Sequence, residues 1–298
     1  MKSYFLKCFL NLLLFPLALS AQDMFWEING TKGGKVYILG TLDVGDRDLY
    51  PLRKEIQEAF TRSNYLILEL RRGDSANAYA FDEMYVKARY DANDSLNKHI
   101  SSQTYKKVQT WLKQQKLPLN AMDRFKPWVI GLTLSSLDMA LWGGEKRLSL
   151  TNYFYEKARR ESKGVYALEH YSEAFLRLSE MDYDLEDSLL QTFIAKRSHT
   201  QELYDERFKN YQEGNLSYFE QSLLDPFEDF PIVKEVVLDE QNALYTKKVK
   251  LYRNNRHGRH YFLIMNLEHL LGDTGVLAQL KEAGIEVKSY EALEDVNP

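Results

Sequence analysis

The feature that most constrains the fold is a strand, helix and strand pattern near the start of the chain. Residues 35–39 form a strand-like run that is apolar after Lys35, a helical pattern with Pro51 in its first turn follows, and a second apolar run at residues 65–68 ends at Glu69. Continuous apolar runs of this length are typical of buried strands in a mostly parallel sheet. A strand at residues 24–28 is expected to form a hairpin with the first run, because glycines separate them. The pattern predicts an α/β fold.

The end of the chain returns to the same organisation. The expected elements are a helix at residues 239–252, a strand at 261–265, a helix around 276–280 and a strand at 286–290. Asp273 or Thr274 is expected to cap the second of these helices, and Pro226 and Pro231 are expected in a loop. The sheet is therefore predicted to combine segments from both ends of the chain.

The middle of the chain, residues 75–225, is dominated by helical patterns. Examples are residues 105–112, 128–141 and 152–160, and residues 165–168 are a candidate for one further strand. This predicts a large helical insertion between the two α/β ends of the chain.

Residues 1–21 have the organisation of a secretory signal peptide. Lysines are followed by an apolar run at residues 9–19 and then by small residues. An uncleaved anchor is the alternative, but the run is shorter than the roughly 20 residues of a spanning helix. The prediction is an exported protein, periplasmic or extracellular, with one domain at residues 22–298 and no stable membrane span. Cleavage would also remove Cys8, the one cysteine, so chemistry would depend on oxygen and imidazole groups.

The composition mainly argues against one class of partner, nucleic acids. The chain is 44% hydrophobic and 28% charged, as in ordinary globular proteins, and its net charge is −4. This charge gives no reason to expect a nucleic acid as partner. The oligomeric state is not indicated.

Three polar residues follow predicted strands. Asp43 comes after the run at residues 35–39, Glu69 ends the run at 65–68, and His269 comes shortly after the run at 261–265. Ligands of open parallel sheets bind beyond the carboxyl ends of the strands. The trio is thus a candidate ligand set for a divalent metal that activates water, or an acid and base set that works without metal.

Each residue also has a structural interpretation. Asp43 lies in a loop where aspartate commonly forms turns, Glu69 precedes two arginines that it could pair with, and His269 could be a satisfied core residue. A second histidine-containing segment, residues 253–260, is interpreted as a solvated turn. A metal site at His257 and His260 is the weaker alternative, because their spacing is not that of ligands on a helix.

Several short segments, in this order and spacing, resemble one known family. They are residues 26–28, 37–42, 44–45, 66–69, 126–128, 168–169, 239–242 and 269–277, with Leu280 and Gly284. Together they resemble the TraB/GumN family, which includes the TIKI-type metalloproteases. The resemblance implies an α/β core with helical additions. In active members it implies a divalent-metal-dependent hydrolase site made of two motif histidines and a glutamate.

The chain keeps part of that site and departs from the rest. Glu69, Asn242 and His269 are kept, whereas Asp43 stands at the first histidine position. In addition, Gln241 replaces the usual arginine and Asn266 the usual glycine. Aspartate moves the metal preference toward harder ions, and loss of the arginine removes a fixed cation.

Two functions follow from these residues. In the first, Asp43, Glu69 and His269 hold manganese, cobalt or zinc, with Glu69 and His269 as catalytic groups. Asn242 then orients a peptide or small-molecule substrate. In the second, the chain is a catalytically inactive binding or interaction protein on the same scaffold.

Overall fold

The computed structural model describes residues 24–42, 45–70, 86–141, 145–170, 178–179, 181–195 and 201–289. Two of the expectations, the signal peptide at residues 1–21 and the position of Asp43, lie outside these residues.

The centre of the molecule is a six-stranded sheet with the order β4-β3-β5-β2-β1-β6. Its strands are β1 (Phe25–Asn29), β2 (Lys35–Thr41), β3 (Tyr65–Leu70), β4 (Gly164–Glu169), β5 (Tyr261–Asn266) and β6 (Lys288–Ser289). Strands β2, β5, β3 and β4 are parallel, whereas β1 is antiparallel to both β2 and β6. The predicted mostly parallel sheet from both ends of the chain is confirmed, as is the hairpin.

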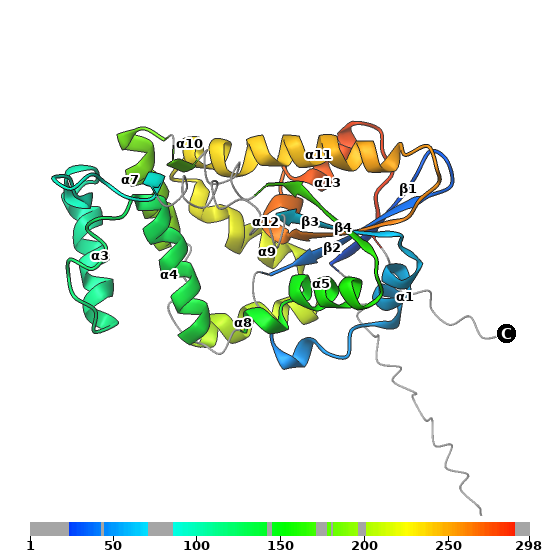
Figure 1. The fold of residues 1–298 in the computed structure, drawn as a ribbon, viewed down its shortest axis with the longest axis horizontal. Helices are drawn as coiled ribbons and strands as arrows, with labels where there is room; N and C mark the ends of the chain where they lie inside the picture. Colours follow the sequence, from blue (N-terminus) through cyan, green and yellow to red (C-terminus); the bar gives the residue numbers. More distant parts are fainter. Residues whose placement is uncertain are drawn as a thin grey trace, which may run out of the picture.

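Helices cover both faces of this sheet (Figure 1). The helices are α1 (Lys54–Arg62), α3 (Ser102–Gln114), α4 (Pro127–Leu141), α5 (Leu150–Arg160), α7 (Tyr183–Ala195), α8 (Gln201–Gln212), α9 (Leu216–Leu224), α10 (Pro231–Lys234), α11 (Glu240–Arg253), α12 (Leu267–Leu270) and α13 (Val276–Glu282). Alternate residues of the strands point to opposite faces. In β2, Val36 and Ile38 pack with α9, α11, α12 and α13, whereas Tyr37 and Leu39 pack with α1 and α5.

The middle of the chain supplies a group of helices beyond the sheet. Helices α3, α4 and α7 lie together at one end of the molecule (Figure 1), around a core that includes Trp111, Ile130 and Leu190. The same region also contributes β4 and α5 to the α/β part. In the part of the chain that the structure describes, no helix has both the length and the apolar character needed to cross a membrane.

The helix expected to begin at residue 239 starts earlier. Pro231 occupies the first turn of α10, where proline needs no backbone hydrogen bond. A π-helical segment, η5 (Glu235–Asp239), then connects α10 to α11 without a break. The expectation of a loop at Pro231 was therefore wrong.

Two smaller expectations also differ from the structure. Helix α1 begins at Lys54, so Pro51 precedes the helix. Gly275, rather than Asp273 or Thr274, occupies the position before α13 and gives no side-chain cap.

Candidate functional site

The parallel strands bring several polar residues to one edge of the sheet. Thr41 of β2 lies opposite Asn266 of β5, and Leu70 of β3 lies opposite Glu169 of β4. The carboxyl ends of four strands therefore meet at this carboxyl edge, where ligands of open α/β sheets bind.

Glu69 joins the ends of two strands. The pairing of β3 with β5 ends at Ile67 and Leu263. Beyond it, Glu69 Oε1 accepts a hydrogen bond of 2.7 Å from the backbone N–H of Asn266. Asn266 also caps α12, because its Oδ1 accepts from the backbone N–H of Glu268. Asparagine at this position therefore has a structural role of its own.

His269 lies on the short helix α12, directly after β5. Its side chain is buried, and its Nδ1 lies 2.8 Å from Oδ1 of Asn242 on α11. The ring of Tyr245 meets the imidazole edge to face, with centroids 5.2 Å apart. Helix α12 and the packing against Tyr245 therefore fix the position of the imidazole, and the contact with Asn242 fixes the rotation of the ring.

A tight loop follows His269. Gly272 has a φ of +79°, a conformation that favours glycine. A Cβ on Gly275 would lie 2.3 Å from the carbonyl oxygen of Leu271. These two glycines allow the chain to turn from α12 into α13 and to place Thr274 beside α11.

The direction of the hydrogen bonds determines which nitrogen of His269 carries the proton. The carbonyl oxygen of Thr274 can only accept, and it lies 3.1 Å from Nδ2 of Asn242. The amide NH₂ of Asn242 therefore faces Thr274, and Oδ1 accepts the proton of His269 Nδ1. In the neutral imidazole the lone pair is then at Nε2. This is the arrangement in which a histidine binds a metal or accepts a proton through Nε2.

Glu169 is a further residue of the edge, which the sequence-based prediction of the site did not include. Its side chain is buried, and Oε2 accepts hydrogen bonds from Gln241 Nε2 at 3.2 Å and from the Tyr245 hydroxyl at 3.4 Å. The signal was present, because Glu169 ends an apolar strand in the same way as Glu69. The side-chain amide of Gln241 thus binds a carboxylate.

The structure brings together part of the predicted site. Asn242 and His269 are in contact, and Glu69 binds the strand end from which His269 follows. Asp43 lies outside the described residues, between Leu42 and Gly45. Within the described ranges, no three His, Cys, Asp or Glu side chains are grouped so that they could hold a metal ion.

His257 and His260 lie at the opposite end of β5. His257 is exposed, and the imidazole of His260 stacks on Tyr37 with centroids 6.4 Å apart. Asn255 Oδ1 accepts from the backbone N–H groups of His257 and Arg259. These bonds are those of a structured turn.

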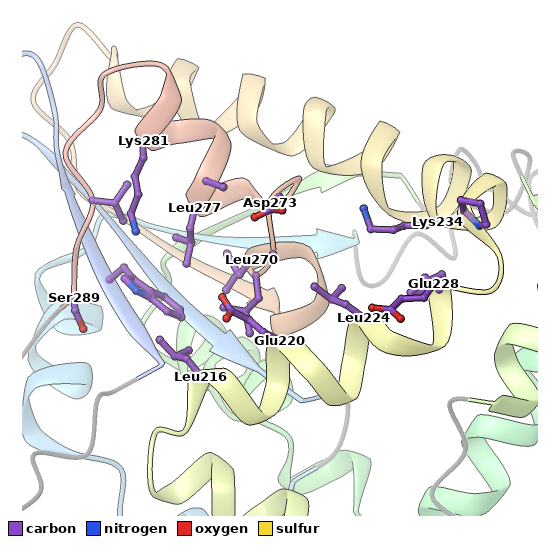
Figure 2. A pocket seen from close by; sticks show the side chains of 17 residues that line it. Leu216, Glu220, Leu224, Glu228, Lys234, Leu270, Asp273, Leu277, Lys281 and Ser289 are labelled. Carbon is purple, nitrogen blue, oxygen red and sulfur yellow. The ribbon is translucent and has the colours of Figure 1, made fainter.

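A surface cavity of about 750 Å³ lies between α9, α12 and α13 (Figure 2). Leucines and Trp26 contribute an apolar lining, and charged side chains, among them Glu220, Asp273 and Lys281, stand around it. Glu69, Asn242 and His269 do not line it. The cavity is therefore separate from the candidate site, although the loop after His269 forms part of its wall.

Comparison with known proteins gives a relative and a family. An uncharacterized protein of Treponema pallidum (strain Nichols) is 24% identical over 174 residues, which are 58% of this chain and 52% of that protein. The chain thus spans about half the length of this relative. The model of the TraB/PrgY/GumN family matches residues 24–289, which include the whole described sheet and the candidate site. The chain belongs to the TraB/PrgY/GumN family.

Proposed function

We propose that the protein is a divalent-metal-dependent hydrolase that acts on peptides or small molecules at the carboxyl edge of its sheet. One observation carries the proposal. Thr274 orients Asn242, and Asn242 in turn holds His269 in the tautomer whose lone pair is at Nε2, the form in which a histidine binds a metal ion or accepts a proton.

The chemistry of the donors fits a divalent cation. The ligands would be the carboxylates of Asp43 and Glu69 and the imidazole of His269. Two carboxylates and one imidazole suit manganese, cobalt or zinc, with more preference for hard ions than a set with two histidines. When bound, such an ion lowers the pKa of a coordinated water and polarises the bond to be cleaved.

The neighbouring residues have supporting roles in this proposal. Asn242 keeps the imidazole in one orientation and one tautomer. Glu169 adds a buried carboxylate to the edge, held by Gln241 and Tyr245, and its negative charge favours a nearby cation.

A second candidate function is non-catalytic binding on the same scaffold. The observation that favours it is Gln241, a neutral amide whose Nε2 is bound to Glu169. A guanidinium at this position would offer a fixed charge to a substrate carboxylate or an oxyanion, and Gln241 does not supply that charge.

Export is also part of the proposal. The signal-like composition of residues 1–21 supports it. N-terminal sequencing of the protein recovered from the periplasm or the medium should show a chain that begins close to Ala21 or Gln22. Recovery of the protein only inside the cell, with Met1 or residue 2 at its start, would contradict export.

The hydrolase proposal is tested with a mixture of fluorogenic peptides and small esters. The full chain should release product with Mn²⁺, Co²⁺ or Zn²⁺ and lose this activity with a chelator. Glu69→Gln keeps the size of the side chain but removes its charge, and it should abolish turnover. Absence of metal-dependent product from the wild-type chain, or full activity of Glu69→Gln, would contradict the proposal.

The second candidate predicts a different result in cells. Stable Asp43→Ala and His269→Ala variants should then restore every phenotype of a gene deletion. Loss of complementation by either variant would count against a purely non-catalytic role.

A further inference from the structure

Three side chains near the candidate site form a closed hydrogen-bonded unit. Lys234 Nζ donates to both carboxylate oxygens of Asp239, at 2.9 and 3.1 Å, and to Thr274 Oγ1 at 2.7 Å. The Thr274 hydroxyl donates to Asp239 Oδ1 at 2.6 Å. We call Lys234, Asp239 and Thr274 the clamp. It joins the helix that carries Asn242 to the loop that follows His269.

The π-helical segment explains why the clamp can form. Lys234 and Asp239 are five residues apart, and in an α-helix such residues point about 140° away from each other. A π-helical turn, in which residues i and i+5 are hydrogen-bonded, brings them to the same side. The segment Glu235–Asp239 has this conformation. Figure 2 shows Lys234 reaching from the end of α10 toward the loop of Asp273.

The clamp fixes the residue that orients the candidate site. Lys234 and Asp239 hold the Thr274 side chain, while the Thr274 carbonyl oxygen accepts from Asn242 Nδ2 and, at 2.7 Å, from Gln279 Nε2. Asn242 then accepts from His269 Nδ1. Hydrogen bonds, joined through the covalent frame of Thr274 and the amide of Asn242, therefore connect Lys234 to the imidazole.

From this connection we infer that Lys234, Asp239 and Thr274 are positioning residues that set the tautomer of His269. They do not touch the imidazole. They fix the Thr274 carbonyl, which determines the orientation of the Asn242 amide and so keeps the proton at Nδ1. The catalytic importance of this tautomer rests on the proposed hydrolase function, but the tautomer itself does not.

The charges of the clamp fit a positioning role. The ammonium of Lys234 and the carboxylate of Asp239 are opposite charges in direct contact, with about a quarter of each side chain exposed, 26% and 28%. The pair therefore adds little net charge to the edge. Its effect on His269 is transmitted through hydrogen-bond geometry.

The test reads the tautomer directly. The full chain is labelled with nitrogen-15 histidine, and long-range proton–nitrogen NMR spectra are recorded at about pH 8, where a histidine of ordinary pKa is neutral. The signal of His269 is assigned among the six histidines by its loss in His269→Gln. The wild-type chain should show the Nδ1–H form. In Thr274→Val and Lys234→Met, the ratio of Nδ1–H to Nε2–H should fall about tenfold, the change expected when the support of one hydrogen bond is lost.

Two variants separate positioning from general damage. Thr274→Ser keeps the hydroxyl and should retain the wild-type tautomer. Thr246→Val makes the same chemical change one helical turn after Asn242, at a buried hydroxyl that has no hydrogen-bond partner in the described part of the chain. It should leave the tautomer unchanged. If Thr274→Val does not fold, Asp239→Asn replaces it, and the ratio of Nδ1–H to Nε2–H should fall in that variant as well.

The possible results are distinct. Retention of the Nδ1–H form in folded Thr274→Val and Lys234→Met, or an equal change in Thr246→Val, would overturn the inference. Such a result together with metal-dependent turnover would leave the hydrolase proposal standing. A tautomer shift in Thr274→Val and Lys234→Met, with no metal-dependent turnover even in the wild-type chain, would support the clamp and contradict the hydrolase.

Discussion

The two ends of β5 each carry a histidine, but the surroundings of the two differ. At the carboxyl end, His269 is buried and its Nδ1 is bound by an amide that is itself oriented by a carbonyl. At the amino end, His260 stacks on Tyr37, and its Nδ1 has no hydrogen-bond partner among the described residues. A histidine near a strand end is therefore not enough to define a site. What distinguishes His269 is a set of neighbours that fixes its ring and its proton.

The largest expected effect is a difference in kcat/KM between variants of the two histidines. His269→Gln should lower kcat/KM for the best substrate by about 10³-fold, because in the proposed hydrolase His269 binds the metal or moves a proton. His260→Gln should leave kcat/KM close to the wild-type value. Steady-state kinetics at saturating Mn²⁺ give both numbers. Equal losses in the two variants would remove the distinction between the two ends of the sheet.

The next prediction compares an asparagine at each end. Asn242→Ala should weaken metal binding by about 10- to 100-fold, because the proposed ligand His269 loses the partner that orients it. Asn255→Ala removes a turn-forming side chain near His260 and should cost about 1 kcal/mol of unfolding free energy, with no effect on metal affinity. Calorimetric titration and urea denaturation measure the two quantities. Unchanged metal affinity in a folded Asn242→Ala protein would count against the role of the amide.

Substitution of a glycine by alanine should also lower the unfolding free energy by different amounts at the two ends of the sheet. Gly275→Ala would place a Cβ 2.3 Å from the carbonyl oxygen of Leu271, so the loop after His269 must shift. We expect a loss of about 1–3 kcal/mol of unfolding free energy. Gly33, in the hairpin at the other end, has a φ of +83°, but a Cβ added there would meet no atom within 4 Å. Gly33→Ala should cost only the backbone strain, about 1 kcal/mol. Thermal unfolding compares the two variants, and a larger loss in Gly33→Ala would contradict this account.

The smallest effect concerns a buried acid away from both ends. Burial raises the pKa of Glu186, although the charge of Lys126 and a hydrogen bond from Tyr90 oppose the shift. The folded state therefore holds the proton to a higher pH than the unfolded state does. This contribution to stability is full below the unfolded pKa and falls as the pH rises to the folded pKa.

Glu186→Gln should accordingly raise the unfolding free energy relative to the wild type at neutral pH. The difference should shrink as the pH falls through the raised folded pKa, and it should be almost gone below the unfolded pKa of about 4.5. Metal affinity should not change, since Glu186 lies among the helices of the middle region. Denaturation curves at a series of pH values provide the test, and a variant that is less stable at neutral pH would contradict the assignment.

The sequence predicted those parts of the fold that depend on local pattern. Uninterrupted apolar runs located β2, β3 and β5, because strands buried on both faces need such runs. A similar short run located the edge strand β4 inside the helical middle. The π-helical segment was not predictable in this way. The spacing of Lys234 and Asp239 fits no α-helical pair, and their contact exists only because the helix widens there.

The candidate site also has parts that local sequence pattern indicates and parts that depend on tertiary packing. The rule of strand ends selected Glu69 and His269 as candidates, and the order of the motifs added Asn242. Thr274 was expected as a helix cap, but its carbonyl and its hydroxyl bind residues on α10, η5, α11 and α13. Such contacts are set by tertiary packing. Glu169 was missed although it repeats the pattern of Glu69, because its partners Gln241 and Tyr245 are distant in the sequence.

Metal stoichiometry tests the central claim most directly. After incubation of the full chain with Mn²⁺, Co²⁺ or Zn²⁺ and removal of unbound ions, elemental analysis should find about one ion per chain in the wild type and in His260→Gln. It should find almost none in Glu69→Gln, Asp43→Ala and His269→Gln. A wild-type chain that retains no ion, or a folded His269→Gln chain that retains as much as the wild type, would contradict the assignment of the carboxyl edge as a metal site.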